Sequence, residues 1–229
     1  MRTAYLFETH MHTSEVSECG HVPAREMIQR YAENGFGGVE VTDHFLPGRF
    51  TSREKREVFL RGYREAADEG VKRNVVVLPA MEIRFSCGPE DYLVLGMEER
   101  ELLDDIPDTV CDMKINAFHL FCTSHGWLFY QAHPFRPGLS VRPAAWLDGV
   151  ETINGNPRHN SHNDLALQYA DAYDLMTLAG SDAHQPEDIA VAGIWIPQEA
   201  LTSKTLVSYL RTIRKPSFYT WYKRGMDGV

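Results

Sequence analysis

The sequence lacks several patterns that would place it in a familiar class. Its four cysteines, Cys19, Cys87, Cys111 and Cys122, form no CxxC pair, which argues against a zinc ribbon and against a disulfide scaffold. No apolar run approaches the roughly 18 residues that a membrane-spanning helix needs, so we expect no membrane association. The N-terminus shows no basic segment followed by an apolar stretch, and we therefore expect a reduced, cytoplasmic location.

Signatures of a protein nucleophile or of a phosphate-binding loop are also missing. The sequence contains no GxSxG, no GxxxxGK[ST], and no cysteine with an obvious partner base. With 32 acidic and 23 basic residues the formal net charge is −9, which repels polyanions and argues against an extended nucleic-acid partner. No linker rich in Pro, Gly or Ser divides the chain, so we expect one domain over residues 1–229.

Short apolar runs alternate with longer amphipathic stretches. The runs cover residues 3–7, 37–42, 75–83, 91–96, 127–132, 149–153, 174–179 and 191–196, with helical patterns at 23–35, 51–70 and 162–173. Runs of this kind are typical of strands buried on both faces. The alternation therefore predicts an α/β fold with a parallel sheet or barrel.

Polar side chains lie at an end of nearly every predicted strand: Asp91 opens its strand, and the others end or follow theirs. They are His10 and His12, Asp43 and His44, Glu82, Asp91, His133, Asn154 and Asn156, and Asp182 and His184. In barrels built from βα units, the C-terminal strand ends converge on one face, where active sites lie. This placement indicates a single site assembled from distant parts of the chain.

The residue types at these positions suit metal ions. Residues i and i+2 of an extended segment point to the same side, so His10 and His12 can reach one ion, and so can Asp182 and His184. Imidazole and carboxylate ligands suit zinc, manganese or iron. The candidates outnumber the four ligands of a single zinc ion, so we expect at least two ions, bridged by Glu82.

Clustered metal ions are suited to the hydrolysis of phosphoesters. One ion lowers the pKa of bound water from 15.7 towards about 7, and its neighbour neutralises phosphoryl oxygens. Such chemistry needs no protein nucleophile, which agrees with the missing nucleophile motifs.

Five motifs, HMH, TDH, AME, QAHP and GSDAH, occur in this order between about residues 8 and 185, and through them the sequence resembles the PHP (polymerase and histidinol phosphatase) family. The resemblance implies a distorted (β/α)7 TIM-like barrel, two or three divalent ions (Zn, Mn or Fe), and metal-dependent phosphoesterase activity. Carried over position by position, it assigns as metal ligands His10, His12, His44, Glu82, His133, Asp182 and His184.

Two positions depart from the commoner family pattern. After the HxH pair the family usually has an Asp or His, and here Glu15 and Glu18 compete. We expect Glu15, because it lies closer to His12 in a turn over the site. The strand after Glu82 commonly carries a His ligand, and Asp91 is the best substitute here. Carboxylates in place of two imidazoles would favour manganese or iron over zinc.

Further candidates lie near the predicted ligands. Arg136 follows His133 closely and could hold a phosphate oxygen, and His159 could contact the substrate or protonate the leaving group. Asp43 is expected to orient a neighbouring ligand. For Cys19, beside the first motif, we expect a buried inert thiol and not a ligand.

The sequence thus predicts a phosphoesterase that acts on a small phosphorylated metabolite or nucleotide. The first alternative is a 3′–5′ exonuclease-like phosphodiesterase on short oligonucleotides, with a basic patch at Arg136, Arg142 and Arg158. The second is a metallohydrolase of C–N bonds, disfavoured because Glu82 stands where such enzymes usually have a bridging lysine. The third is a non-catalytic, metal-stabilised scaffold, disfavoured by the near-complete ligand set.

Overall fold

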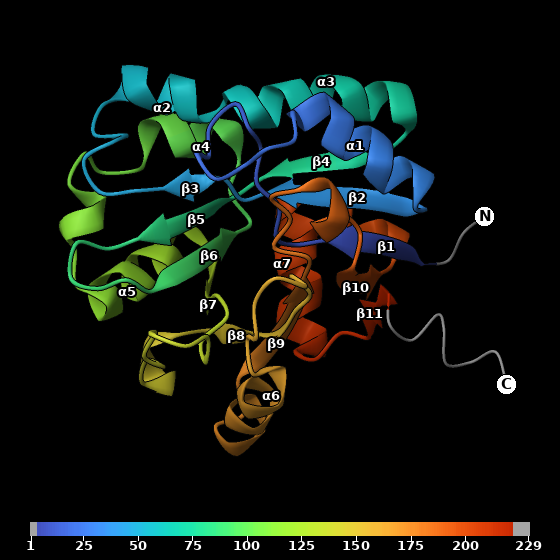
Figure 1. The fold of residues 1–229 in the computed structure, drawn as a ribbon. Coiled ribbons are helices and arrows are strands. Elements are labelled where there is room, and N and C mark those ends of the chain that lie inside the picture. Colours follow the sequence, from blue (N-terminus) through green and yellow to red (C-terminus); the bar gives the residue numbers. More distant parts are fainter. Residues whose placement is uncertain (1–3, 222–229) are drawn as a thin grey trace, which may run out of the picture.

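The computed structural model describes residues 4–221, which form two mixed sheets with helices around them (Figure 1). The five-stranded sheet has the order β11-β10-β1-β2-β4, with β1 Tyr5–Glu8, β2 Phe36–Val41, β4 Val76–Pro79, β10 Ala192–Ile196 and β11 Phe218–Thr220. The six-stranded sheet has the order β3-β5-β6-β7-β8-β9, with β3 His44–Phe45, β5 Met81–Arg84, β6 Asp91–Leu95, β7 Leu128–Gln131, β8 Gly149–Asn154 and β9 Met176–Gly180.

Seven α-helices connect and cover the strands within residues 4–221. They are α1 Ala24–Glu33, α2 Arg53–Phe59, α3 Arg61–Arg73, α4 Glu99–Asp104, α5 Ile115–His125, α6 Asn163–Ala172 and α7 Ser203–Ile213. In Figure 1, α1 and α3 lie side by side over β2 and β4. Every residue of β2 is buried, as expected for a strand covered on both faces. In the described part of the chain, no helix is long and apolar enough to cross a membrane.

The α/β class is confirmed, but the sheets are not parallel throughout. Strands β1, β2 and β4 are parallel, as are β7, β8 and β9, whereas β6 runs antiparallel to both β5 and β7. Only residues 85–90 separate β5 from β6. A parallel crossover needs about a dozen residues or more, and a connection as short as this one therefore gives an antiparallel pair.

Backbone hydrogen bonds connect the two sheets beyond their ladders. His12 N–H donates to Ala183 O at 2.9 Å, and Glu82 N–H donates to Asp43 O at 3.1 Å. The first bond joins the chain after β1 to the chain after β9, and the second joins the chain after β2 to β5. The strand ladders among residues 4–221 do not close into a barrel, so the (β/α)7 barrel stays a prediction.

Candidate metal centre

The first and last of the predicted motifs lie side by side at the ends of β1 and β9. Ala183 N–H donates to His10 O at 3.3 Å, and Met11 pairs with Ala183 in a parallel bridge. Gly180 makes this approach possible, because a Cβ at this position would lie 2.5 Å from the Cβ of His10. The pairing brings His10, His12 and Asp182 together although about 170 residues separate them.

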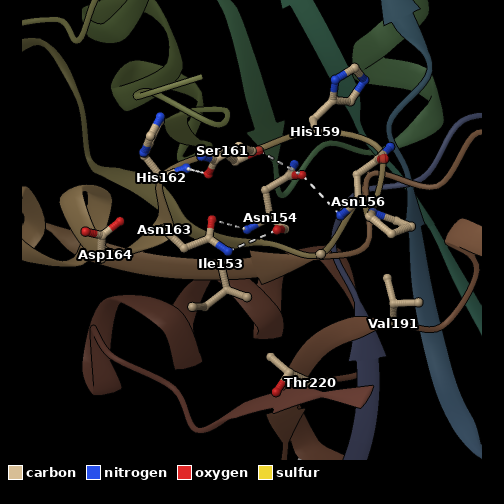
Figure 2. Close-up of a pocket in the computed structure, with 13 residues that line it drawn as sticks. Ile153, Asn154, Asn156, His159, Ser161, His162, Asn163, Asp164, Val191 and Thr220 are labelled. Atoms are coloured by element: carbon tan, nitrogen blue, oxygen red, sulfur yellow. Dashed lines mark hydrogen bonds between the residues drawn. The ribbon is translucent and has the colours of Figure 1, made fainter. Parts of the chain in front are cut away.

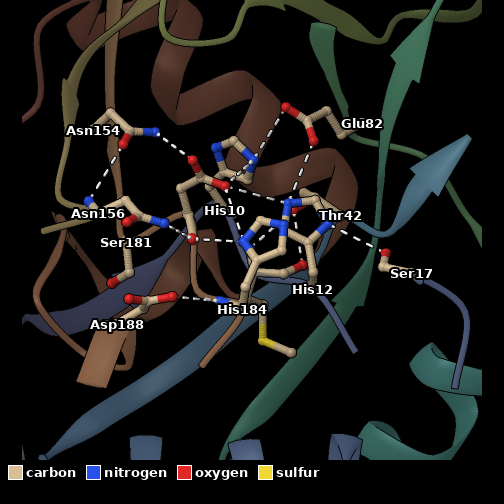
Figure 3. A network of polar contacts seen from close by, with 12 residues as sticks. His10, His12, Ser17, Thr42, Glu82, Asn154, Asn156, Ser181, His184 and Asp188 are labelled. Carbon is tan, nitrogen blue, oxygen red and sulfur yellow. Dashed lines mark hydrogen bonds and ion pairs between the residues drawn. The ribbon is translucent and has the colours of Figure 1, made fainter. Parts of the chain in front are cut away.

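The carboxylate of Glu82, on β5, lies among four imidazoles. Figure 3 shows two of them, those of His10 and His12, beside it. Its Oε1 is 3.3 Å from Nε2 of His10 and 3.3 Å from Nε2 of His133. Its Oε2 is 3.3 Å from Nε2 of His12 and 2.8 Å from Nδ1 of His44. Glu82 has no exposed surface. This is the position in which a carboxylate can bridge two ions.

Asp182 provides a second carboxylate to the cluster. Its Oδ1 is 3.4 Å from Nε2 of His10 and 3.5 Å from Nε2 of His12. The Nδ1 of His184 lies 2.9 Å from the backbone oxygen of Asp182. This contact assigns the proton to Nδ1, so Nε2 of His184 keeps its lone pair for a ligand role.

These atoms fit a site for divalent metal ions. Among the described residues, Nε2 of His10, Nε2 of His12 and both oxygens of Glu82 are buried without a hydrogen-bond partner, a costly arrangement unless something else binds them. Two ligands about 2.0–2.2 Å from one tetrahedral ion are themselves roughly 3.3 Å apart, close to the separations of Glu82 from the imidazoles.

Three overlapping groups have ligand atoms within 4.8 Å of one another: His12–His44–His184, His10–His12–Asp182 and His44–Glu82–Asp91. The three groups contain seven different residues, more than one four-coordinate ion can use, so the arrangement suits more than one ion.

Two candidate ligands have strained backbones. His133 has φ 30° and Asp182 has φ 52°, in a region that residues other than glycine rarely adopt. Such strain persists only where the surroundings impose it, and it is concentrated at functional sites.

Glu151, on β8, is a part of the site that the sequence analysis missed. Its Oε1 lies 2.8 Å from Nδ1 of His10. Its Oε2 accepts hydrogen bonds from the backbone N–H of His133 at 2.9 Å and from Nδ2 of Asn154 at 3.0 Å. The Glu151 contact assigns the proton to Nδ1 of His10 and leaves Nε2 to face Glu82. An acidic residue inside the apolar run 149–153 was the available signal.

Glu8, at the end of β1, is a second residue that the sequence analysis missed. Its Oε1 accepts hydrogen bonds at 2.9 Å from the backbone N–H groups of Thr9, His10 and Ser181, and its Oε2 accepts one from Tyr31 Oη at 2.8 Å. Burial raises the pKa of Glu8 to about 7, although these hydrogen bonds oppose the shift. Glu8 thus holds the two motif-bearing segments in register.

Asp43 lies behind His12, in a position that fits the orienting role predicted for it. Its Oδ1 accepts a hydrogen bond from Ser17 Oγ at 2.7 Å, and that Oγ lies 3.4 Å from Nδ1 of His12. Asp43 also accepts hydrogen bonds from the backbone N–H and the hydroxyl of Thr13, both at 2.7 Å.

Glu15 does not face the cluster, contrary to expectation. Its two carboxylate oxygens accept the backbone N–H of Ala24 at 3.1 and 3.0 Å, at the start of α1. The first N–H groups of a helix have no partner within the helix, and the helix dipole attracts a negative charge there. Glu18 points away too, since its side chain is 84% exposed and lies 3.4 Å from Nη1 of Arg49.

Cys19 is exposed, and the expectation of a buried thiol was wrong. It lies at the same cavity as His44 and His184. Partial burial raises the pKa of the Cys19 thiol, but hydrogen bonds with His184 and His44 outweigh this and lower it to about 6.

Asp91 lies at the cluster, but Arg84 occupies its oxygens. Nε and Nη2 of Arg84 donate to its two carboxylate oxygens at 2.8 and 2.7 Å. Its carboxylate is nevertheless within reach of His44 and Glu82. The ligand role of Asp91 therefore stays a prediction.

A cavity of about 240 Å³ opens onto the cluster, and we call it the metal cavity. Three arginines line it, and each pairs with a carboxylate: Arg84 with Asp91, Arg136 with Asp182, and Arg158 with Asp188. The Nη2 of Arg136 donates to Asp182 Oδ2 at 2.6 Å and to Asn154 Oδ1 at 3.1 Å. A wall of guanidinium groups suits an anionic substrate.

His159 lies between the metal cavity and a neighbouring pocket of about 360 Å³ (Figure 2), and it lines both. Burial and the nearby charge of Arg136 lower the pKa of His159. The neutral imidazole is therefore favoured at pH 7, which weakens the predicted role as a proton donor and leaves substrate contact.

Comparison with known proteins agrees with the motifs. The family model described as PHP-associated matches residues 160–214. No curated protein sequence matches the chain. This match covers 55 of the 229 residues, so it shows a similarity to the family model over that segment alone.

Several solved structures share the fold. A two-domain protein from Bacteroides vulgatus ATCC 8482, containing a predicted PHP-like metal-dependent phosphoesterase, has a TM-score of 0.66 at 15% identity and covers 95% of this chain. PsfC from Pseudomonas syringae PB-5123 has a TM-score of 0.63 at 15% identity and covers 86%. The chain spans 65% of the first structure and 83% of the second.

An amidohydrolase from Chromobacterium violaceum, with bound sulfate and no metal, has a TM-score of 0.57 at 16% identity. The match covers 93% of this chain and 97% of that one. The TM-scores show a shared fold, and at identities of 15–16% the chemistry has to be argued from the site itself.

Proposed function

We propose that this chain is a metal-dependent phosphoesterase that hydrolyses a small phosphorylated metabolite or nucleotide at a multinuclear centre. The observation that carries the proposal is the Glu82 carboxylate, buried among four imidazoles with both oxygens lacking hydrogen bonds to described residues. The arginine-lined wall of the metal cavity supports an anionic substrate. Seven residues are proposed as ligands: His10, His12, His44, Glu82, His133, Asp182 and His184.

When bound, divalent ions supply Lewis acidity and make coordinated water acidic enough to react near neutral pH. The chain's own residues position the substrate. A guanidinium has five N–H donors, and the hydrogen bonds of the Arg136 side chain to described residues all come from Nη2. Donors of Arg136 therefore remain for a phosphate oxygen, while the same group keeps Asp182 oriented.

Hydrolysis of a C–N bond is the second candidate, because the chain shares its fold with a protein named as an amidohydrolase. The arginine wall favours the phosphoester, since a neutral amide gives three guanidinium groups no charge to bind. An exonuclease-like activity on short oligonucleotides would extend along Arg142 and Arg158. Arg142, however, does not line the metal cavity.

The test compares p-nitrophenyl phosphate, bis(p-nitrophenyl) phosphate and p-nitroacetanilide as substrates. We expect hydrolysis of a phosphoester that chelator abolishes and Mn²⁺, Fe²⁺ or Zn²⁺ restores, and we expect Glu82→Gln to be inactive with less bound metal. Faster hydrolysis of the monoester would support a phosphorylated metabolite or nucleotide as substrate. Faster hydrolysis of the diester would support an exonuclease-like activity. Metal-loaded protein inactive on both phosphoesters would refute the proposal, and cleavage of the anilide alone would favour C–N chemistry.

A further inference from the structure

The loop between β1 and α1 brings Cys19, and neither of the two acids predicted there, to the metal cavity. Glu15 caps α1 and Glu18 is exposed, whereas Cys19 lies at the cavity with His44 and His184. Both imidazoles lie close enough to interact with its thiol. The position after the HxH pair therefore presents sulfur to the cluster.

The neighbouring imidazoles give an independent sign of a ligand. Nitrogen atoms of His12, His44 and His184 lie within 4.8 Å of one another, and the ring centroid of His12 is 4.3 Å from that of His44 and 4.2 Å from that of His184. His12 is fully buried, and its Nε2 has no hydrogen-bond partner among the described residues. Three imidazoles so close together repel one another when charged, so a cation bound by neutral rings is the favourable alternative.

We propose that Cys19 is a thiolate ligand of the metal ion held by His12, His44 and His184. This inference rests on the proposed metal centre and changes its chemistry. A thiolate beside imidazoles suits zinc, iron or cobalt, whereas manganese prefers oxygen ligands. With Glu15 directed to α1, the expectation of manganese or iron over zinc, which depended on the carboxylates, no longer applies at this ion.

The chain offers a matched control. Cys87 is also a free, exposed cysteine, and it does not line the metal cavity. Cys111 and Cys122 are buried, and burial raises the pKa of both thiols. Replacement of either exposed cysteine by serine removes one sulfur atom without opening a cavity in the core.

The experiment loads the full chain with Co²⁺ and records its absorption together with its metal content. We expect a thiolate-to-cobalt charge-transfer band in the near ultraviolet for the wild type and for Cys87→Ser, and its loss in Cys19→Ser. We also expect alkylation of Cys19 by iodoacetamide to slow at least about tenfold on metal loading, because a coordinated thiolate is no longer a free nucleophile. Circular dichroism confirms that each variant is folded.

Two results overturn the inference, and they are distinguishable. If cobalt binds but the band is absent from the wild type, or survives in Cys19→Ser, then Cys19 is not a ligand and the metal centre stands. If the folded wild type binds no cobalt, zinc or manganese, the metal centre itself is wrong and the inference falls with it.

Discussion

The Oε1 atom of Glu151 lies 2.8 Å from Nδ1 of His10, although 141 positions separate the two residues along the chain. Neither has any exposed side-chain surface. This carboxylate fixes the tautomer of the imidazole and the direction in which Nε2 points.

Replacement of this carboxylate tests the relationship. Glu151→Gln keeps the size of the side chain but removes the charge that orients His10, and we expect metal affinity to fall about 10–100-fold. Titration of the chelator-treated protein with Zn²⁺ measures this. Glu40→Gln is the matched control, because Glu40 is equally buried but its carboxylate makes no hydrogen bond to the described residues. Equal affinities of the two variants would contradict the role of Glu151.

Glu15→Gln tests the assignment of Glu15 to the start of α1. Glutamine keeps an acceptor oxygen but loses the negative charge that the helix dipole attracts, which is worth about 0.3–1 kcal/mol of the free energy of unfolding. We expect a loss of this size without a change in bound metal. Urea denaturation and elemental analysis provide the two readouts. Glu18→Gln should change neither quantity, since Glu18 is exposed. A fall in metal content in Glu15→Gln would restore Glu15 as a ligand.

Much of this site was predictable from the sequence, because its motifs lie at strand ends and its paired candidate ligands are two positions apart, on the same side of an extended segment. His10 and His12 could be paired with Asp182 and His184 because strand ends meet at one edge. Glu15 and Glu18 could not be separated in the same way. Their directions depend on where α1 begins and on which side the loop turns, and spacing carries no information about either.

The fold was predictable to the same degree. Alternating apolar runs gave the α/β class, but the direction of β6 depends on the short connection from β5. Two neighbouring apolar runs look alike whether they pair parallel or antiparallel. The role of Glu151 could not be predicted, because its apolar run resembles an ordinary buried strand and its partner His10 lies far away in the sequence.

Arg136→Lys separates substrate binding from support of the cluster. Lysine keeps the charge but loses the planar fork, so it cannot bind Asp182 and a phosphate oxygen together. We expect KM for p-nitrophenyl phosphate to rise about tenfold, equivalent to about 1.4 kcal/mol, with bound metal unchanged. Steady-state kinetics and elemental analysis measure both. Unchanged KM with lost metal would assign Arg136 to the support of Asp182 alone.

Glu40 gives the protein a pH-dependent stability. Burial raises its pKa well above the usual range, and the backbone of Gly96 opposes this only in part. The folded state therefore holds a proton that the unfolded state releases above about pH 4.5. Because the folded state binds one proton more, the free energy of unfolding falls as the pH rises above about 4.5. The fall is at most about 1.4 kcal/mol per pH unit.

Glu40→Gln removes this titration and should flatten the dependence. Urea midpoints at pH 5, 6 and 7 for wild type and variant measure the difference in slope. We expect the variant to gain stability relative to the wild type as pH rises. Parallel curves would show that Glu40 is ionised in the folded protein.

The two sheets approach each other where the candidate ligands lie. His10 and His12 follow a strand of the five-stranded sheet, while Glu82 belongs to the six-stranded sheet. An ion held between them is thus also a cross-link between the two halves of the molecule. Its binding free energy then adds to the free energy of folding, and a cell that limits the metal supply would limit the lifetime of the folded protein as well as its activity.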